Sequence, residues 1–527
     1  MRFFNTAGPV RCEKHYCFPP LTRFNLDEIL SLINQEKYFV LHAPRQTGKT
    51  SSLLALMEHL NQEGRYRCLY VNVEVAQAAR EDVAKGIQAI LNEIASWART
   101  TLGDTFVGTI WSDVLAQSGE HTALGEVLTR WSEHSPKPVV LLIDEIDALI
   151  GDTLISVLRQ LRAGYTKRPA LFPQSVILCG VRDVRDYRIH SSREKTIITG
   201  GSAFNVKAES LRLGNFAKSD VETLYRQHTQ ETGQSFEDAA LDLVWDLTRG
   251  QPWLVNALGY ELCFKMKPGR ERSTTITDGM VIEAKERIIL RREIHIDQLT
   301  DKLREERVRS VIEPILAGKV QPRRLIEDDV QYVQDLGLIT TRGQLRIANK
   351  IYQEVIPRAL TYTTQLTITH QPAWYILPNG SLDADKLLAA FQDFFRQHSE
   401  HWVERLDYKE AGPQLLLQAF LQRIVNSGGR VEREYGLGRM RTDLLVVWPY
   451  GDNGQIQRIV IELKIVYKSL NHTIEQGLEQ TWEYTDRCDA GEGHLVIFDR
   501  DSEKAWEEKI FKREETYRGM TITVWGM

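Results

Sequence analysis

Short, continuous apolar segments alternate with longer helical patterns through residues 38–180. Strands that are buried on both faces have this character, because helices cover each face of a parallel sheet. The pattern therefore predicts an α/β fold built on a parallel sheet. The expected strands are Tyr38–His42, Cys68–Val73, Val139–Ile143 and Val176–Cys179.

Beyond residue 205 the pattern becomes helical. A predicted helix ends at Gly250, and Pro252 lies at the start of the next, where a missing amide proton costs nothing. Residues 300–360 then have the order helix, helix, short hairpin, helix. The hairpin would turn at Arg342 and Gly343. That order is typical of a winged helix.

The C-terminal part has the order helix, strand, strand, strand, helix, strand. The expected helices are 413–426 and 473–487, and the expected strands are 430–435, 442–448, 458–466 and 494–498. A polar segment, 361–381, with Pro372 and Pro378, precedes this part and is the best candidate for a linker. The chain is therefore expected to be an α/β protein of several domains.

Composition narrows the class of protein. The chain has 527 residues, 42% of them hydrophobic and 26% charged, and a formal net charge of −5. No apolar run approaches the roughly 18 residues of a membrane span, and the N-terminus lacks an apolar signal core. We therefore expect a cytoplasmic protein without a membrane partner. Cys12, His15 and Cys17 match no common zinc spacing, so reduced thiols are the favoured interpretation.

A phosphate-binding loop follows the first predicted strand and begins a helix. Such a loop needs inward-facing backbone amides, a lysine for the phosphates and a hydroxyl for Mg²⁺. Gly48 allows close approach of the backbone, Lys49 would contact the β- and γ-phosphates, and Thr50 would bind Mg²⁺. Alanine replaces the first glycine of the usual pattern. The expected ATP-binding residues are Ala43, Pro44, Arg45, Gln46, Thr47, Gly48, Lys49, Thr50 and Ser51.

The apolar strand 139–143 ends in two acidic residues, which complete this site. Asp144 would hold Mg²⁺ through water, and Glu145 would act as the general base that polarises the attacking water. ATP and Mg²⁺ are therefore the expected cofactors.

Residues 1–295 resemble the AAA+/STAND ATPases, close to the archaeal-type ATP-binding proteins. The resemblance implies an ATPase core over 1–205 and a helical lid over 206–295. It implies that Arg182, after the fourth predicted strand, senses the γ-phosphate, with a surface arginine as an equal alternative. It also implies that Pro252, in Gly250-Gln251-Pro252, touches the nucleotide. Relatives turn ATP over slowly, switch conformation with it and assemble into homo-oligomers.

Two carboxylates and a lysine lie on consecutive predicted strands near the C-terminus. Alternation places Glu462 and Lys464 on one face. Asp443 would lie opposite Glu462 if the hairpin turns between Asp452 and Asn453, and opposite Lys464 if the turn is one residue later. Oxygen ligands of this kind suit Mg²⁺ or Mn²⁺, so Asp443 and Glu462 are expected metal ligands.

Residues 405–500 resemble the PD-(D/E)XK nuclease superfamily, with Thr442 in place of the proline of its name. The resemblance implies catalytic roles for Asp443, Glu462 and Lys464, and a supporting role for Gln480 and Tyr484 on the following helix. An acidic residue on the first helix is an extra ligand in many members; here Glu410, just upstream, is the nearest. The remaining boundaries are a winged-helix-like domain over 296–365, a linker over 366–400 and the nuclease-like domain over 401–527.

The basic residues around the winged-helix-like domain favour a solvated surface of mixed sign over a nucleic-acid site, because acidic residues are interleaved with them. The basic group is Arg304, Arg307, Arg309, Lys319, Arg323 and Arg324.

Two functions fit these patterns. The first is an ATP-hydrolysing switch that controls a metal-dependent nuclease acting on nucleic acid, DNA more readily than RNA, in a role such as bacterial defence. The second is an ATPase switch or loader whose nuclease-like domain binds nucleic acid or protein without cutting.

Overall fold

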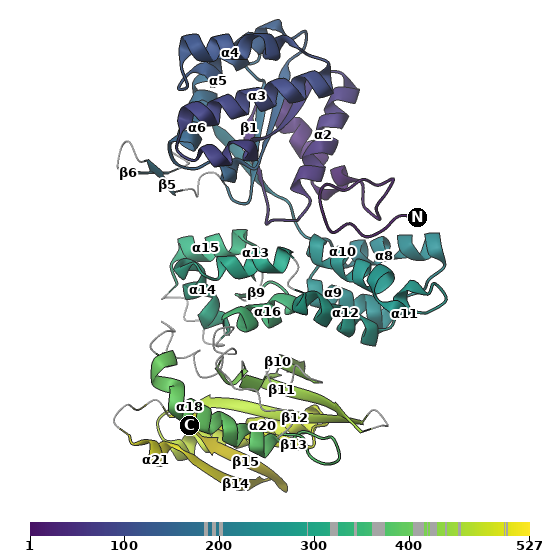
Figure 1. Cartoon of the computed structure of the whole chain (residues 1–527), viewed down its shortest axis with the longest axis vertical. Helices are drawn as coiled ribbons and strands as arrows, with labels where there is room; N and C mark the ends of the chain where they lie inside the picture. The colour runs from purple at the N-terminus through teal and green to yellow at the C-terminus, as the bar shows by residue number, and fades with distance from the viewer. Residues whose placement is uncertain are drawn as a thin grey trace. The chain divides into compact units, whose positions relative to one another are not determined.

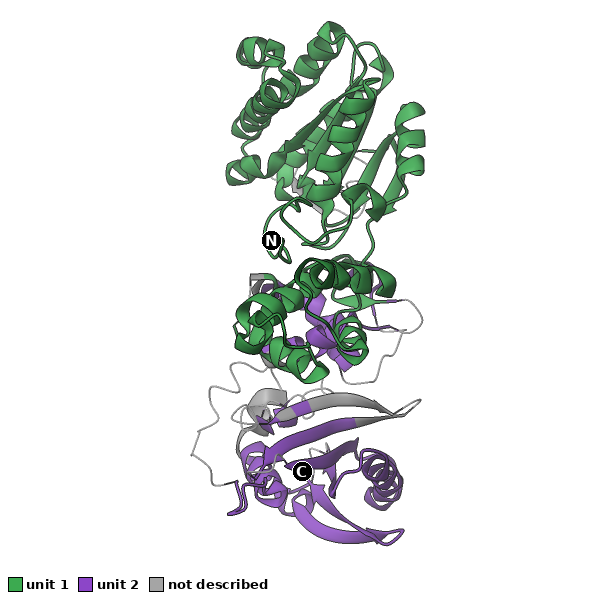
Figure 2. Cartoon of the chain, turned by 90° about the vertical axis from the view of Figure 1, so that its right-hand side faces the viewer, with its two compact units in different colours: residues 1–295, 330–340 green, residues 296–329, 341–527 purple. Residues whose placement is uncertain are grey.

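The computed structural model describes the whole chain except residues 184–187, 192–195, 200–203, 292–293, 317–324, 342–344, 361–374, 404–415, 419, 422–428, 438–439, 452–454, 500 and 502–503. Figure 1 shows the elements along the chain. The chain divides into two compact units, residues 1–295 with 330–340 and residues 296–329 with 341–527 (Figure 2).

The core of the first unit is a five-stranded sheet with the order β2-β3-β4-β1-β7, and every neighbouring pair is parallel. The four predicted strands are confirmed. The fifth strand, β7, pairs with β1, so the sheet extends past residue 205, where the core was expected to end. The strands are β1 Tyr38–His42, β2 Arg67–Asn72, β3 Val139–Asp144, β4 Ser175–Gly180 and β7 Lys207–Arg212.

Helices cover both faces of this sheet, as the continuous apolar strands predicted. Apolar side chains of α1 (Leu26–Asn34) and α2 (Lys49–Glu63) pack on one face. Those of α3 (Val83–Leu102), α5 (Ala123–His134) and α6 (Gly151–Gly164) pack on the other. The shorter α4 (Phe106–Ser118) packs beside α3 and α5 (Figure 1).

The rest of the first unit is mostly helical, as predicted for the lid. A small antiparallel pair, β5 (Arg188–Ser191) and β6 (Thr196–Thr199), precedes it. The lid helices are α8 Lys218–Thr232, α9 Asp238–Thr248, α10 Pro252–Tyr260, α11 Lys267–Arg270 and α12 Asp278–Leu290, with a π-helical turn at Glu261–Lys265.

The region expected to be a winged helix contains α13 (Ile294–Lys302), α14 (Glu306–Leu316), α15 (Glu327–Asp335) and α16 (Lys350–Leu360). Two short strands, β8 (Ile339–Thr340) and β9 (Arg346–Ile347), lie where the hairpin strands were predicted. The expected turn at 342–343 lies outside the described residues.

The second unit is built on a six-stranded mixed sheet with the order β10-β11-β12-β13-β15-β14. Its first three strands are antiparallel neighbours, and β13 is parallel to both β12 and β15. The strands are β10 Arg430–Leu437, β11 Met440–Tyr450, β12 Gln455–Ile465, β13 Glu492–Phe498, β14 Phe511–Tyr517 and β15 Met520–Gly526, with α20 at Leu470–Arg487. The predicted order is confirmed from the first of these strands to β13, while β14 and β15 were not predicted.

Residues 384–403 form the helix α18 (Ala384–Val403), so the expectation of a linker over 366–400 was wrong for this part. Its apolar side chains, among them Leu388 and Phe391, are buried against the sheet in the core of this unit. The physical reason is an amphipathic face that the sheet covers. The predicted helix 413–426 lies largely outside the described residues, although 416–418 and 420–421 are helical.

A search of the described helices finds none with the length and apolar character needed to span a membrane.

Candidate nucleotide and metal sites

The predicted phosphate loop joins the end of β1 to the start of α2. Gly48 precedes the helix with φ of 94°, and Gln46 has φ of 58°. Thr47 Oγ1 donates to the carbonyl oxygen of Pro44 at 2.7 Å, which closes the turn. Left-handed residues of this kind turn successive backbone amides toward one side, as anion binding requires. The loop therefore has the backbone form that the sequence predicted.

Lys49 is buried, with 5% of its surface exposed, and its ammonium group bonds to the loop itself. Nζ donates to the carbonyl oxygens of Ala43 at 2.9 Å and Pro44 at 3.1 Å. A buried ammonium that donates to neutral carbonyls is well placed to exchange them for an anion, because charged partners bind more strongly. This arrangement fits a triphosphate.

Asp144 meets Thr50 at the carboxyl end of β3. Thr50 Oγ1 donates to Asp144 Oδ2 at 2.7 Å, and the Tyr70 hydroxyl donates to the same oxygen at 3.0 Å. Asp144 is fully buried. Burial, together with the Asp144 carboxylate, raises the pKa of Tyr70, so its hydroxyl stays a donor. The hydroxyl and carboxylate oxygens are the donors that Mg²⁺ prefers.

Glu145 follows directly, in a left-handed conformation with φ of 57°. Burial raises the pKa of its carboxyl group, and repulsion from Asp147 adds to the effect. A raised pKa makes a carboxylate a better proton acceptor, which suits the predicted general base. Asp147 accepts a hydrogen bond from the backbone of Val181 at 3.0 Å and so ties this acidic turn to the end of β4.

A cavity of about 150 Å³ opens beside the loop. Gln46, Thr47, Gly48 and Ser51 of the predicted set line it, and so does Pro252 of the lid. The structure therefore brings Pro252 together with the phosphate loop. The other walls were not predicted, because no motif marks them. They include Asn5, Thr6, Ala7, Gly8, Val10, Cys17, Phe18, Arg23, Phe216, Trp253 and Asn256.

Arg23 is the most informative of the missed residues. Its guanidinium donates to the carbonyl oxygen of Thr47 at 3.1 Å and to that of Gly214 at 2.6 Å. It also lies over the Phe216 ring, 4.5 Å from the centroid. Burial lowers the pKa of Arg23 to about 10, and it stays charged at neutral pH. A positive charge is therefore fixed at the wall of the cavity, which favours an anionic ligand.

Gly250 explains how the lid chain turns into α10 and places Pro252. It has φ of 72°, and its carbonyl oxygen accepts from the backbone of Phe216 at 2.9 Å. A Cβ atom at Gly250 would lie 2.1 Å from the Phe216 carbonyl oxygen, so no larger residue fits without movement.

We expect Gly250→Ala to lower the stability of the lid by about 2–4 kcal/mol, because it adds steric overlap to an unfavourable φ. Gly233→Ala is the matched control, since Gly233 also has positive φ, of 77°, but open space around it. Chemical denaturation should show the larger loss for Gly250→Ala. Equal losses in the two variants would mean that the contact with Phe216 is unimportant.

Arg182 lies just after β4, as predicted for a sensor. Its side chain is largely buried; Nε lies 3.7 Å from Asp335 Oδ2, and the guanidinium lies over the Tyr332 ring at 4.7 Å. A surface arginine, the alternative interpretation, does not fit this burial. The sensor role stays a prediction, because the partner shown here is a carboxylate.

Cys12 and Cys17 form a disulfide, with Cα atoms 5.6 Å apart. The interpretation as reduced thiols is therefore wrong for this structure, and the spacing of five residues is short enough for a local bridge. Among the described residues, no group of three or more His, Cys, Asp or Glu side chains is arranged to hold a metal ion.

The predicted acidic pair of the C-terminal sheet converges across β11 and β12. Leu444 pairs with Ile461, which places Asp443 opposite Glu462, the first of the two predicted registers. The Asp443 backbone donates to Glu462 Oε2 at 3.4 Å, and Asp443 Oδ2 accepts from the Leu463 backbone at 2.9 Å. Lys464 Nζ donates to Glu462 Oε1 at 2.6 Å. All three candidate residues therefore lie together.

Burial raises the pKa of Glu462 well above that of an ordinary carboxyl group, and repulsion from Asp443 acts in the same direction. Lys464 partly opposes this shift. A divalent cation would relieve the repulsion that a buried carboxylate feels from a second carboxylate beside it. The two carboxylates fit Mg²⁺ or Mn²⁺, which bind through one or two carboxylates completed by water and phosphate oxygens.

The raised pKa predicts a pH dependence. Metal and proton compete for the same oxygens, so Mn²⁺ affinity should increase as pH rises through the raised pKa of Glu462. Without metal, the stability of the fold should change with pH in the opposite direction. The contribution of Glu462 to the free energy of unfolding is fully present below the ordinary carboxyl pKa, and it is lost as pH rises through the raised pKa of Glu462 in the folded protein.

Titration of Mn²⁺ by calorimetry at about pH 5.5 and about pH 8.5 measures this dependence. Glu462→Gln, which has no titrating carboxyl, should bind weakly at both values. Equal affinity of the unaltered protein at the two values would contradict the assignment of Glu462 as a ligand.

The helix α20 covers the face of the sheet that carries this pair. Tyr484 is buried against Leu445, Val447 and Val460, so it serves the core. Gln480 has its side-chain oxygen buried. Its catalytic role stays a prediction. Glu410 lies outside the described residues.

Two of the basic residues near α14 have acidic partners. Arg307 pairs with Asp329 at 3.0 Å and Arg304 with Asp301 at 3.7 Å. These contacts agree with a solvated surface of mixed sign. Lys319, Arg323 and Arg324 lie outside the described residues.

Comparison with known proteins identifies the class of the first domain. Residues 33–187 match the family model described as AAA domain. This part of the chain is an AAA-type P-loop ATPase domain, and ATP binding follows from that class. The match covers the phosphate loop and the acidic strand end but neither the lid nor the C-terminal sheet. No curated protein matches the chain.

Three solved structures are similar over about two thirds of the chain. The Walker-type ATPase of Pyrococcus abyssi is 14% identical, with a TM-score of 0.44, over 67% of this chain and 99% of that one. Cdc6p from Pyrobaculum aerophilum is 15% identical (TM-score 0.36; 65% and 93% covered). The RuvB Holliday junction branch migration motor of Thermotoga maritima is 14% identical (TM-score 0.32; 63% and 95% covered).

Proposed function

We propose that the chain is an ATP-hydrolysing switch that controls a metal-dependent nuclease. Support for hydrolysis comes from Glu145, whose carboxyl group has a raised pKa and lies next to Asp144. In this proposal Lys49 holds the phosphates, Thr50 and Asp144 hold Mg²⁺, and Glu145 accepts the proton of the attacking water. When Mg²⁺ is bound, it would neutralise the negative charge that develops on the phosphates during hydrolysis.

The switch proposal rests on the walls of the cavity. They come from the N-terminal segment, the phosphate loop and the lid, so one ligand would contact all three. A ligand can shift a conformational equilibrium only by binding one arrangement better than another. A nucleotide that bridges three separate segments meets that condition, since loss of its γ-phosphate would change the contacts that hold them together. Assembly into homo-oligomers is a further expectation of this proposal.

The nuclease proposal is carried by one observation: Asp443, Glu462 and Lys464 converge at one point of β11 and β12. In this proposal Asp443 and Glu462 would hold Mg²⁺ or Mn²⁺, and the ion would supply polarisation of a phosphodiester. Lys464 positions the attacking water and balances charge, and Gln480 supports it from α20. The substrate would be nucleic acid, DNA more readily than RNA. Cytoplasmic bacterial defence is the setting that we propose.

A second candidate function is favoured by Lys464. Its 2.6 Å contact neutralises Glu462 without any metal, so the same surface could bind nucleic acid or protein and not cut. In that case the AAA domain would act as a switch or loader for the bound partner.

The two candidates differ in what happens to a substrate. Purified protein would be incubated with plasmid, linear DNA and RNA, with and without ATP and Mn²⁺. The nuclease proposal predicts metal-dependent cleavage of DNA that responds to ATP. Binding of DNA without cleavage under every condition would reject the nuclease and support the second candidate.

A further inference from the structure

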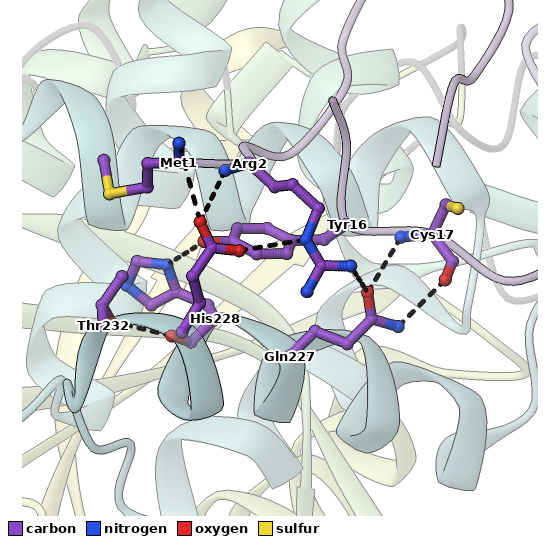
Figure 3. A network of polar contacts seen from close by, with 8 residues as sticks. Met1, Arg2, Tyr16, Cys17, Gln227, His228 and Thr232 are labelled. Atoms are coloured by element: carbon purple, nitrogen blue, oxygen red, sulfur yellow. Dashed lines mark hydrogen bonds and ion pairs between the residues drawn. The ribbon is translucent and has the colours of Figure 1, made fainter. Parts of the chain in front are cut away.

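The N-terminal segment, residues 1–18, is fastened to the lid helix α8. Figure 3 shows its side chains and backbone reaching three polar positions of that helix. The contacts are Arg2 Nε with Glu231 at 3.0 Å, the Tyr16 hydroxyl with His228 Nδ1 at 3.1 Å, and the Cys17 backbone with Gln227, as donor at 3.1 Å and as acceptor at 2.9 Å.

The same segment also contacts the phosphate-loop helix. The Val10 backbone donates to Ser51 Oγ at 2.9 Å, and Asn5 to Gly8 line the candidate ATP cavity. The segment therefore runs from the start of α2 at Val10 to the lid at Cys17. It therefore contacts two walls of the cavity.

The Cys12–Cys17 disulfide closes the loop between those two contacts. Cys17 lines the cavity, whereas Cys12 is exposed. A disulfide restricts the backbone conformations of the loop that it closes. In its presence the segment is held in the form that contacts both the phosphate loop and the lid.

A second line of contacts leads from the disulfide to the phosphate loop. Phe18 follows the disulfide directly, and its ring packs on Phe216 with centroids 5.4 Å apart. Phe216 supports the guanidinium of Arg23, which bonds to the carbonyl oxygen of Thr47. A change in the cysteine loop would thus reach the backbone of the phosphate loop through one aromatic contact and one arginine.

An external thiol should react with the Cys12–Cys17 pair and not with the other cysteines, because the other cysteines are buried. The other cysteines, Cys68, Cys179, Cys263 and Cys488, are all buried. Burial raises the pKa of the Cys68 thiol, and it does the same for Cys179 and Cys263. The thiolate is the reactive form, so these thiols are poor partners for exchange. An external thiol would react at the exposed Cys12.

We propose that Cys12 and Cys17 form a thiol–disulfide exchange site, whose substrate is a dithiol reductant and whose oxidation state sets the affinity for ATP. A thiolate of the dithiol attacks Cys12 Sγ, the Cys12–Cys17 bond breaks, and Cys17 leaves as a thiolate. The second thiol of the reductant then displaces Cys12. The chain gains two electrons and two protons, and the dithiol becomes a disulfide. Bridges of this kind in the cytoplasm are usually transient and redox-sensing.

The oxidised form should bind ATP more tightly. The disulfide already orders the N-terminal segment that forms one wall of the cavity, so less conformational entropy is lost when ATP binds. We expect reduction to weaken binding by roughly fivefold to tenfold, a change of about the size that ordering a short loop produces. The inference rests on the proposed ATP site, since it concerns the affinity of that cavity.

The test measures binding of a fluorescent, non-hydrolysable ATP analogue to the full chain. One sample is oxidised with oxidised glutathione, one is reduced with a phosphine, and one is the variant Cys12→Ser/Cys17→Ser. Alkylation under native conditions, followed by mass spectrometry, reports the state of the pair. The oxidised sample should resist labelling at Cys12 and bind most tightly, and the variant should bind like the reduced protein in both buffers.

Three results would count against these conclusions in different ways. Equal affinity of the oxidised and reduced protein, with the two states verified by mass spectrometry, would overturn the inference and leave the ATP site intact. Failure of Cys12 and Cys17 to pair under oxidation would also overturn it. Absence of binding in every sample would reject the ATP site and the inference with it. The comparison of the two wild-type samples decides the matter even if the double variant does not fold.

Discussion

Replacing Lys49 with alanine is expected to abolish ATP binding, with a loss of affinity of about 100-fold or more. Lys49 is buried, and among the described residues its ammonium group donates to the carbonyl oxygens of Ala43 and Pro44. The phosphate oxygens of a bound nucleotide would carry full charge and would meet a positive group that is already desolvated, so we expect their interaction with Lys49 to be stronger than the one it replaces. Fluorescence titration with an ATP analogue measures the loss.

Lys85→Ala is the matched control for Lys49→Ala. The Lys85 side chain is 77% exposed and pairs with Asp82 at the start of α3. The Lys85→Ala protein should bind ATP with the affinity of the unaltered protein. Thermal melting of both variants separates loss of binding from loss of folding. If a folded Lys49→Ala protein bound ATP with unchanged affinity, the assignment of the phosphate loop would be wrong.

Asp443→Ala is expected to remove metal-dependent cleavage, by roughly 100-fold or more, if the C-terminal domain is a nuclease. The Asp443 carboxylate accepts from the Leu463 backbone and lies beside Glu462, so its loss removes one of the two candidate metal ligands. Removing a neighbouring negative charge also relieves the repulsion that raises the pKa of Glu462. The variant should therefore bind Mn²⁺ weakly while its Glu462 titrates nearer the ordinary carboxyl range.

A plasmid-cleavage assay with Mn²⁺ is the measurement for this second prediction. Glu514→Ala is the control, because Glu514 is an exposed acid on β14 of the same sheet. Lys464→Ala should lose cleavage but keep metal binding, which separates its role from that of the carboxylates. Cleavage by the Asp443→Ala protein at the rate of the unaltered chain would refute the proposed metal site.

The sequence predicted those features of the fold and the site that depend on the local pattern of residues. The continuous apolar runs identified β1 to β4, and the phosphate loop and the acid at the end of β3 follow from spacing alone. Alternation placed Glu462 and Lys464 on one face, but left two registers for Asp443. The pairing of Leu444 with Ile461 decides between them. That choice depends on the hairpin backbone, which sequence alone did not specify.

What the sequence did not predict depends on contacts between distant segments. Lys207–Arg212 is an edge strand with exposed polar positions, so it has no apolar run to mark it, and only its pairing with β1 makes it a strand. The N-terminal segment contains no motif for a nucleotide, yet it supplies a wall of the cavity through Asn5 and Val10. The one available signal was the Cys12–Cys17 spacing, which we interpreted as reduced thiols and which the structure shows as a disulfide.

The most direct test of the central claim is a structure of the chain determined with a non-hydrolysable ATP analogue and Mg²⁺. The account predicts phosphates against the backbone of Gln46–Thr50, with Lys49 Nζ moved from the carbonyl oxygens of Ala43 and Pro44 to a phosphate. It also predicts Mg²⁺ between Thr50 and Asp144, in place of their 2.7 Å hydrogen bond. An analogue bound elsewhere, with that hydrogen bond and the Lys49 contacts unchanged, would contradict it.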